Sequence, residues 1–135
     1  MKTEFTILIA DPNRRVRQFL RREFGSEGYR VLLAENGNAL SCMIRENDDL
    51  DLLVLDDAML VLNESRVPEQ LENRIPPLPF ILHSFSPESA PSKLMGSAAA
   101  LVEKSGDIEE LKRTVSQVLS RQVQHRTNRD AAARI

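Results

Sequence analysis

Short apolar runs alternate with helix-like patterns along the whole chain. Runs of strand length occur at residues 7–10, 29–34, 51–56, 78–84 and 98–103. Between the first two, Val16, Leu20 and Phe24 recur at helical spacing, and Leu40, Met43 and Ile44 do so after the second. This alternation predicts an α/β fold, with a doubly wound five-stranded parallel sheet and about five helices. Right-handed crossovers place the first and last helices on one face and the others on the opposite face.

The second half of the chain is less regular than the first. Prolines at 68, 76, 77, 79, 87 and 91 predict that the third and fourth helices are short or irregular. We place the third within residues 68–74, with Leu71 and Ile75 facing the sheet. The last helix begins near Asp107 and carries a clear apolar stripe. Residues 1–120 therefore form one domain, and 121–135 are expected to be a C-terminal helix extension or a disordered tail.

Composition narrows the class of protein. The 135 residues fit one domain, and a net charge of −2 gives no sign of direct nucleic-acid binding or membrane attachment. The lone cysteine, Cys42, lies at core spacing in a helical pattern, which excludes a disulfide framework and fits a reducing compartment. No apolar stretch is long enough to span a membrane, and the start of the chain lacks a signal-peptide pattern. We therefore expect a cytoplasmic protein.

Four strand-like runs end on residues suited to phosphoryl chemistry: Asp11, Asp56, Ser84 and Lys104. The carboxyl ends of parallel strands lie along one sheet edge, so these side chains are expected to share a small cleft. Phosphoryl transfer to a carboxylate needs an exposed oxygen, cations and a donor that recognises the product. Asp56 is the natural acceptor, and Asp11 is a candidate Mg²⁺ ligand. Lys104 supplies a positive charge and Ser84 a hydroxyl.

Some of these residues also have purely structural interpretations. Asp11 followed by Pro12 is a good helix start, with Asp as N-cap and Pro at the first helical position. Asp56 with Asp57 is also compatible with a solvated strand end. If strand alternation continues to residue 57, the Asp57 side chain points away from Asp56.

Other polar residues give weaker signals. Arg14, Arg17 and Arg21 share one helical face, which favours a solvated face over a phosphate-binding stripe. His83 lies inside an apolar run and is expected to be a strand residue packed beneath a helix. Neither it nor His125 indicates a metal site.

The order and spacing of the four strand-end residues resemble the receiver domain of two-component response regulators, over about residues 4–120. That resemblance implies a flavodoxin-like (CheY-like) fold in a bacterial signalling domain that is not an enzyme. Asp56 would accept a phosphoryl group from a histidine kinase or phosphotransfer protein. Ser84 and Lys104 would contact the phosphate, while Asp11, Asp56 and the backbone carbonyl of Ala58 would hold Mg²⁺. A conformational switch would then act on a downstream protein target, and a homodimer is left open.

Four positions depart from the pattern of that family. Pro12 replaces a second acid, which is expected to weaken Mg²⁺ binding, with Asn13 as a weaker neutral ligand. Leu60 and Ser105 replace prolines, and Leu101 stands where a switch aromatic is expected.

Three hypotheses follow. In the first, the chain is a receiver domain that is still phosphorylated at Asp56. In the second, it is a pseudo-receiver that acts as a phosphorylation-independent protein-interaction module. A haloacid-dehalogenase-type phosphatase is disfavoured, because that family needs an aspartate where Ala58 stands, and because the chain lacks a cap domain and further acids in the required setting after Lys104.

Overall fold

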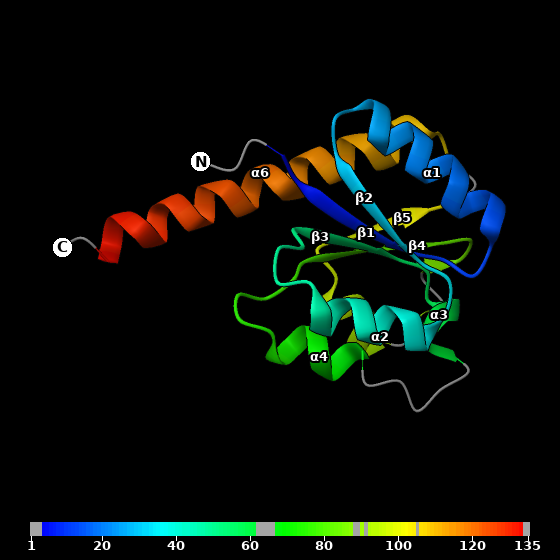
Figure 1. Cartoon of the computed structure of the whole chain (residues 1–135), viewed down its shortest axis with the longest axis horizontal. Coiled ribbons are helices and arrows are strands. Elements are labelled where there is room, and N and C mark those ends of the chain that lie inside the picture. The colour runs from blue at the N-terminus through cyan, green and yellow to red at the C-terminus, as the bar shows by residue number, and fades with distance from the viewer. Residues whose placement is uncertain (1–3, 62–66, 88–89, 91, 105, 134–135) are drawn as a thin grey trace.

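A five-stranded sheet lies between two layers of helices in the computed structural model, which describes residues 4–61, 67–87, 90, 92–104 and 106–133 (Figure 1). All its neighbouring strands are parallel, in the order β2-β1-β3-β4-β5. The strands are β1 Thr6–Ala10, β2 Arg30–Ala34, β3 Leu52–Leu55, β4 Phe80–Ser84 and β5 Ala100–Glu103. The described helices are α1 Arg14–Ser26, α2 Gly37–Glu46, α3 Ala58–Val61, α4 Val67–Asn73, α5 Ser92–Ser97 and α6 Ile108–Ala133. The predicted doubly wound, flavodoxin-like fold is confirmed.

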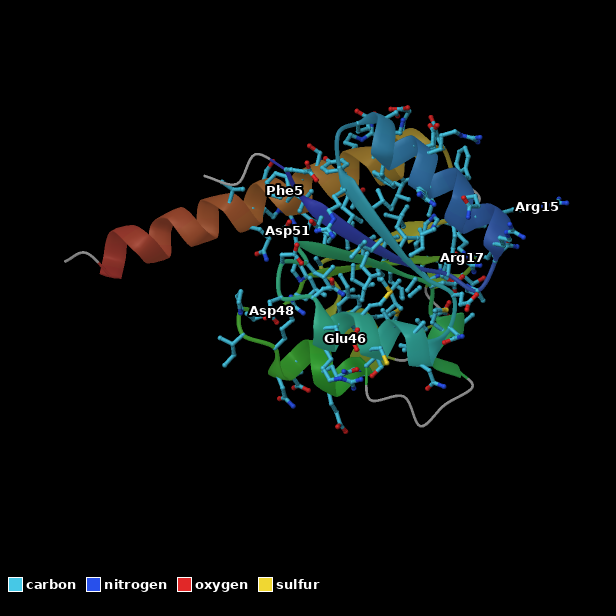
Figure 2. All side chains as sticks on the ribbon, in the orientation of Figure 1. Phe5, Arg15, Arg17, Glu46, Asp48 and Asp51 are labelled. Carbon is cyan, nitrogen blue, oxygen red and sulfur yellow. The ribbon has the colours of Figure 1, made fainter. Side chains whose placement is uncertain are left out.

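Side chains alternate between two cores along the central strands. Leu53, Leu55 and Leu82 pack on the side of α2, α4 and α5, while Ile9, Val54 and Ile81 pack against α1 and α6. Figure 2 shows side chains filling the space between the sheet and both helical layers. The near-continuous apolar character of the strands thus reflects burial on both faces. The predicted pairing of the first and last helices on one face is correct.

The region between β3 and β4 differs in part from the sequence prediction. A one-turn helix, α3, directly follows β3, and α4 lies close to the predicted third helix. Leu71 is buried as expected, but Ile75 is 93% exposed. Ile75 was wrongly assigned to the core because α4 ends at Asn73, so helical spacing from Leu71 no longer applies there. The predicted fourth helix is α5, which is short as expected.

Helix ends are set by local chemistry. After α1, Gly28 adopts a positive φ of 93°, a conformation that other residues rarely reach.

In α2, Leu40 and Ile44 face the core, but Cys42 is exposed. The prediction that Cys42 lies at a core position is therefore wrong, because the buried stripe of this short helix follows Leu40 and its i+4 partner.

The last helix is much longer than its apolar stripe. Asp107 accepts a hydrogen bond from the backbone N–H of Glu109 at 3.0 Å, which marks the start of α6. Leu111, Val115 and Leu119 are buried against the sheet. The helix backbone then continues to Ala133 and extends past the amino end of the strands (Figure 1). No helix within the described part of the chain is long and apolar enough to cross a membrane.

Candidate functional site

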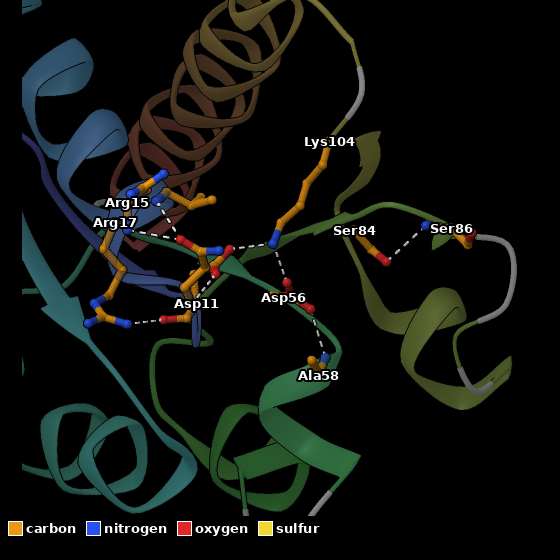
Figure 3. A network of polar contacts seen from close by, with 10 residues as sticks. Asp11, Arg15, Arg17, Asp56, Ala58, Ser84, Ser86 and Lys104 are labelled. Carbon is orange, nitrogen blue, oxygen red and sulfur yellow. Dashed lines mark hydrogen bonds and ion pairs between the residues drawn. The ribbon is translucent and has the colours of Figure 1, made fainter.

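The four strand-end residues singled out in the sequence all lie at the carboxyl edge of the sheet. Asp11 follows β1, Asp56 follows the central strand β3, Ser84 ends β4 and Lys104 follows β5. Figure 3 shows Asp11, Asp56 and Lys104 converging, with Ser84 on the neighbouring strand. We call these four residues the edge site. Three of the side chains are almost fully enclosed, because Asp11, Asp56 and Ser84 are only 2%, 7% and 5% exposed.

Lys104 bridges the two carboxylates. Its Nζ lies 2.5 Å from Asp11 Oδ2 and also contacts Asp56 Oδ2 (Figure 3). The Lys104 side chain is only 5% exposed, so its charge is screened little by solvent. One ammonium therefore balances two buried carboxylates only in part, and the three groups carry a net charge of −1.

The other carboxylate oxygens are held by the backbone. Asp11 Oδ1 accepts the N–H of Asn13 at 2.8 Å, and Asp56 Oδ1 accepts the N–H of Ala58 at 2.7 Å. Both bonds span two residues, the pattern that a short acidic side chain makes at the start of a turn. The turns after β1 and β3 thus orient both acids so that their Oδ2 atoms face each other across Lys104.

The protonation equilibria of Asp56 and Lys104 reflect this pairing. Burial acts to raise the pKa of Asp56, but the hydrogen bonds from Lys104 and from the Ala58 N–H outweigh it, and the pKa lies below its ordinary value. For Lys104, burial acts to lower the pKa, but the hydrogen bonds to Asp11 and Asp56 raise it above the ordinary value. Asp56 is therefore an ionised carboxylate at neutral pH, as a nucleophile requires.

Asp57 is part of this neighbourhood, contrary to the sequence prediction. Burial and a hydrogen bond with the Asp56 side chain raise the pKa of Asp57, while a hydrogen bond with Ser84 opposes the rise. Strand alternation does not apply, because β3 ends at Leu55 and the chain then turns into α3. The signal in the sequence is the end of the apolar run at Leu55, beyond which strand alternation need not continue to Asp57.

The N-cap of α1 is not Asp11, contrary to the purely structural interpretation of that residue. Asn13 is the N-cap of α1, and its Oδ1 accepts the N–H groups of Arg15 and Val16 at 2.9 and 3.2 Å. Asp11 is not the cap. Because the Asn13 amide oxygen is occupied in this way, the earlier prediction of Asn13 as a neutral metal ligand is not supported by the geometry.

Arg17 was wrongly placed on a solvated face. It is 9% exposed, and its Nη1 donates a 2.7 Å hydrogen bond to the backbone carbonyl of Asp11. Figure 2 shows Arg15 pointing outward, whereas Arg17 turns toward the sheet edge. The guanidinium holds the end of β1 against α1 and places a second positive charge beside the edge site.

His83 is a buried residue of strand β4, as predicted. Burial, together with the nearby charge of Lys104, lowers its pKa from 6.5 to about 4, although Asp11 and Asp56 oppose this effect. His83 is therefore neutral at pH 7.

Three of the positions that depart from the receiver pattern can be located. Leu60 lies in α3 and packs, partly buried, against the core on the side of α2, α4 and α5. Pro12 is exposed between β1 and α1 and offers no side-chain ligand. Leu101 is on the edge strand β5 and is 44% exposed. Ser105 lies outside the described residues.

The donor set at the edge site suits a cation. Asp11 Oδ2 is fully buried, makes no hydrogen bond of regular geometry and meets the Lys104 ammonium at 2.5 Å. Two carboxylate oxygens thus converge on one position for positive charge, and such oxygens are the ligands that Mg²⁺ prefers. The carboxylates of Asp11 and Asp56 therefore suit a divalent cation chemically. In the structure, the Lys104 ammonium lies between them. No cluster of three or more acidic, histidine or cysteine ligands occurs among the described residues.

Comparisons with known proteins give a consistent picture of the fold. No family model matches the chain, and neither does any curated protein. Among solved structures, the receiver domain of Francisella response regulator 1452 is 24% identical, with a TM-score of 0.73 over 87% of this chain and 98% of that chain. A chain from the complex of histidine kinase ThkA with response regulator TrrA is 29% identical, with a TM-score of 0.69 over 85% and 98%. The CheY-like receiver domain from Methanospirillum hungatei JF-1 is 18% identical, with a TM-score of 0.74 over 91% and 99%.

The chain has the fold of response regulator receiver domains, as expected from the sequence. Receiver domains are signalling domains. The order of the strands also places Asp56 at the end of the central strand, beside Lys104 and Ser84.

Proposed function

We propose that this chain is a receiver domain that accepts a phosphoryl group on Asp56 from a histidine kinase or a phosphotransfer protein. The observation that carries the proposal is the ionised Asp56 carboxylate, which ends the central strand and pairs with the buried Lys104 ammonium. In the transfer, the P–N bond of a phosphohistidine breaks and a P–O bond to the Asp56 carboxylate forms. The imidazole leaves with the electron pair of the broken bond.

The surrounding groups have definable roles. The Lys104 ammonium neutralises charge on the incoming phosphoryl oxygens, and the Ser84 hydroxyl donates a hydrogen bond to one of them. Asp11, Asp56 and the backbone carbonyl of Ala58 would hold Mg²⁺. When bound, the metal would offset further negative charge on the phosphoryl group. Pro12 removes one carboxylate from this set, so we propose weak Mg²⁺ binding.

A histidine kinase is the partner whose chemistry fits this proposal, and one similar structure comes from a complex of a histidine kinase with a response regulator. Such a partner implies a cytoplasmic location. We also propose that phosphorylation changes the contacts made with a downstream protein or with a second copy of the chain.

A direct test treats the protein with acetyl phosphate and Mg²⁺ and follows its intact mass. We expect the wild type to gain one phosphoryl group and Asp56→Asn to gain none. Asp49→Asn is a matched control, since it removes a half-exposed carboxylate that pairs with Arg30 at the amino end of the sheet, and it should leave the mass gain intact. If the wild type does not gain mass, or if Asp56→Asn still does, Asp56 is not the acceptor.

The pseudo-receiver hypothesis has observations in its favour. Pro12 weakens the cation site, Leu101 replaces an aromatic, and both Asp11 and Asp56 already have their charge offset by Lys104. A pseudo-receiver would keep the same oligomeric state with and without beryllofluoride in size-exclusion chromatography. A beryllofluoride-dependent change would exclude this alternative.

A further inference from the structure

Phe85 covers the charged end of Lys104. It directly follows β4, is 69% exposed, and its ring centroid lies 5.3 Å from Lys104 Nζ. Neither core cluster includes this side chain. A cation within about 6 Å of an aromatic face is attracted by the ring quadrupole, which explains why the ring lies over the ammonium.

The position of the Phe85 ring affects access to the edge site, because the side chains next to the ring are almost fully buried. Lys104 and Asp56 have side chains that are 5% and 9% exposed, and Ser84 immediately precedes Phe85. A phosphoryl group that bonds to Asp56 has to meet Lys104 and Ser84 as well. The Phe85 ring is the large exposed side chain that contacts the Lys104 ammonium.

We propose that Phe85 restricts the access of small phosphodonors to Asp56, an inference that rests on the proposed function. The ring has to leave Lys104 before a phosphoryl group can pair with the ammonium. A protein donor can displace it by using binding energy from contacts far from the phosphate, which a small donor lacks. Phe85 is thus a specificity-determining residue.

The test compares wild type, Phe85→Ala and Phe85→Leu with acetyl phosphate as the probe. In this reaction the P–O bond to acetate breaks, a P–O bond to Asp56 forms, and acetate leaves with the electron pair. We expect phosphorylation of Phe85→Ala to be about tenfold faster, the size expected from losing a partly desolvated cation–π contact. Phe85→Leu keeps an apolar side chain but loses the aromatic face, so its rate should fall between the other two.

A second measurement does not depend on phosphorylation. Reductive methylation with formaldehyde and cyanoborohydride, read by peptide mass spectrometry, reports how accessible each lysine amine is. Lys112, which pairs with Glu23 and Glu27 at 3.2 and 3.3 Å, is the internal reference. Labelling of Lys104 relative to Lys112 should rise severalfold in Phe85→Ala. Because Phe85 is exposed and outside the core, the variant is expected to fold.

The outcomes separate the two proposals. If all variants are phosphorylated at equal rates and Lys104 labelling is unchanged, the role of Phe85 is overturned and Asp56 remains the acceptor. If no variant is phosphorylated but Lys104 labelling rises in Phe85→Ala, the proposed function fails, while shielding of Lys104 by Phe85 is supported.

Discussion

Replacing Lys104 with methionine is expected to lower the free energy of unfolding by about 3 kcal/mol at pH 7 in metal-free buffer, the usual cost of removing one partner from a buried ion pair. Methionine retains much of the apolar stem but no charge, so Asp11 and Asp56 would face each other without a cation. Both carboxylates are enclosed, at 2% and 9% side-chain exposure. Urea denaturation followed by circular dichroism measures the loss.

Divalent metal should partly reverse that loss. In Lys104→Met the two Oδ2 atoms are released, and Mg²⁺ at millimolar concentration can bind the folded state alone and stabilise it by mass action. The gain in stability on adding Mg²⁺ should therefore be larger in Lys104→Met than in the wild type, where the ammonium competes for Asp11 Oδ2 and Asp56 Oδ2.

Two control variants test whether the unpaired carboxylates cause the loss of stability in Lys104→Met. In the double variant Asp11→Asn with Lys104→Met, a single buried carboxylate remains, so the repulsion between Asp11 and Asp56 is removed and part of the lost stability should return. Lys112→Met removes a lysine whose partners, Glu23, Glu27 and Glu109, are much more exposed, and it should cost far less. A Lys104→Met protein that is as stable as the wild type and indifferent to Mg²⁺ would show that the bridge contributes little.

Much of the fold was predictable because each buried strand carries its own signal. The runs around β3 and β4 are apolar on both faces, and β1 ends at Ala10, directly before Asp11, as expected. The sequence therefore correctly predicts that the residues at the strand ends lie at one edge of the sheet. The register of the parallel strands brings Asp11, Asp56 and Lys104 together. That register depends on the apolar pattern of every strand in the sheet.

Errors occurred where regular spacing stops. Asp57 was assigned by strand alternation beyond the end of β3, and Ile75 by helical spacing beyond the end of α4. The helical face with Arg17 is predicted to be solvated because no aromatic platform accompanies its arginines, but the partner of Arg17 is a backbone carbonyl, which no side-chain pattern records. The contact of Phe85 with Lys104 was likewise not visible, since it joins two loops that meet only after β4 and β5 pair.

Stability is expected to fall between pH 6.5 and about 4 because of His83, whose folded pKa lies at about 4 rather than 6.5. In that range the unfolded chain binds a proton at His83 that the folded chain does not. The free energy of unfolding therefore decreases as the pH is lowered through this window, by about 3 kcal/mol from this residue. Above pH 6.5 the His83 imidazole is neutral in both the folded and the unfolded chain, so the stability lost at lower pH is fully present there.

The measurement compares wild type with His83→Gln, a neutral variant that does not titrate, by urea denaturation at several pH values between 7 and 4.5. Asp57 titrates with a raised pKa and affects both proteins alike, so the difference between the two curves isolates His83. The wild type should lose more stability than His83→Gln as the pH falls.

The physical origin of this effect is first the burial of His83 and then its position near the charge of Lys104. His83 is 8% exposed and lies near the Lys104 ammonium, so a proton on the imidazole adds a second positive charge in a place that water hardly reaches. The carboxylates of Asp11 and Asp56 favour that proton, but burial and Lys104 outweigh them. Equal slopes for wild type and His83→Gln would mean that the imidazole is solvated when protonated, and that neither burial nor Lys104 lowers its pKa.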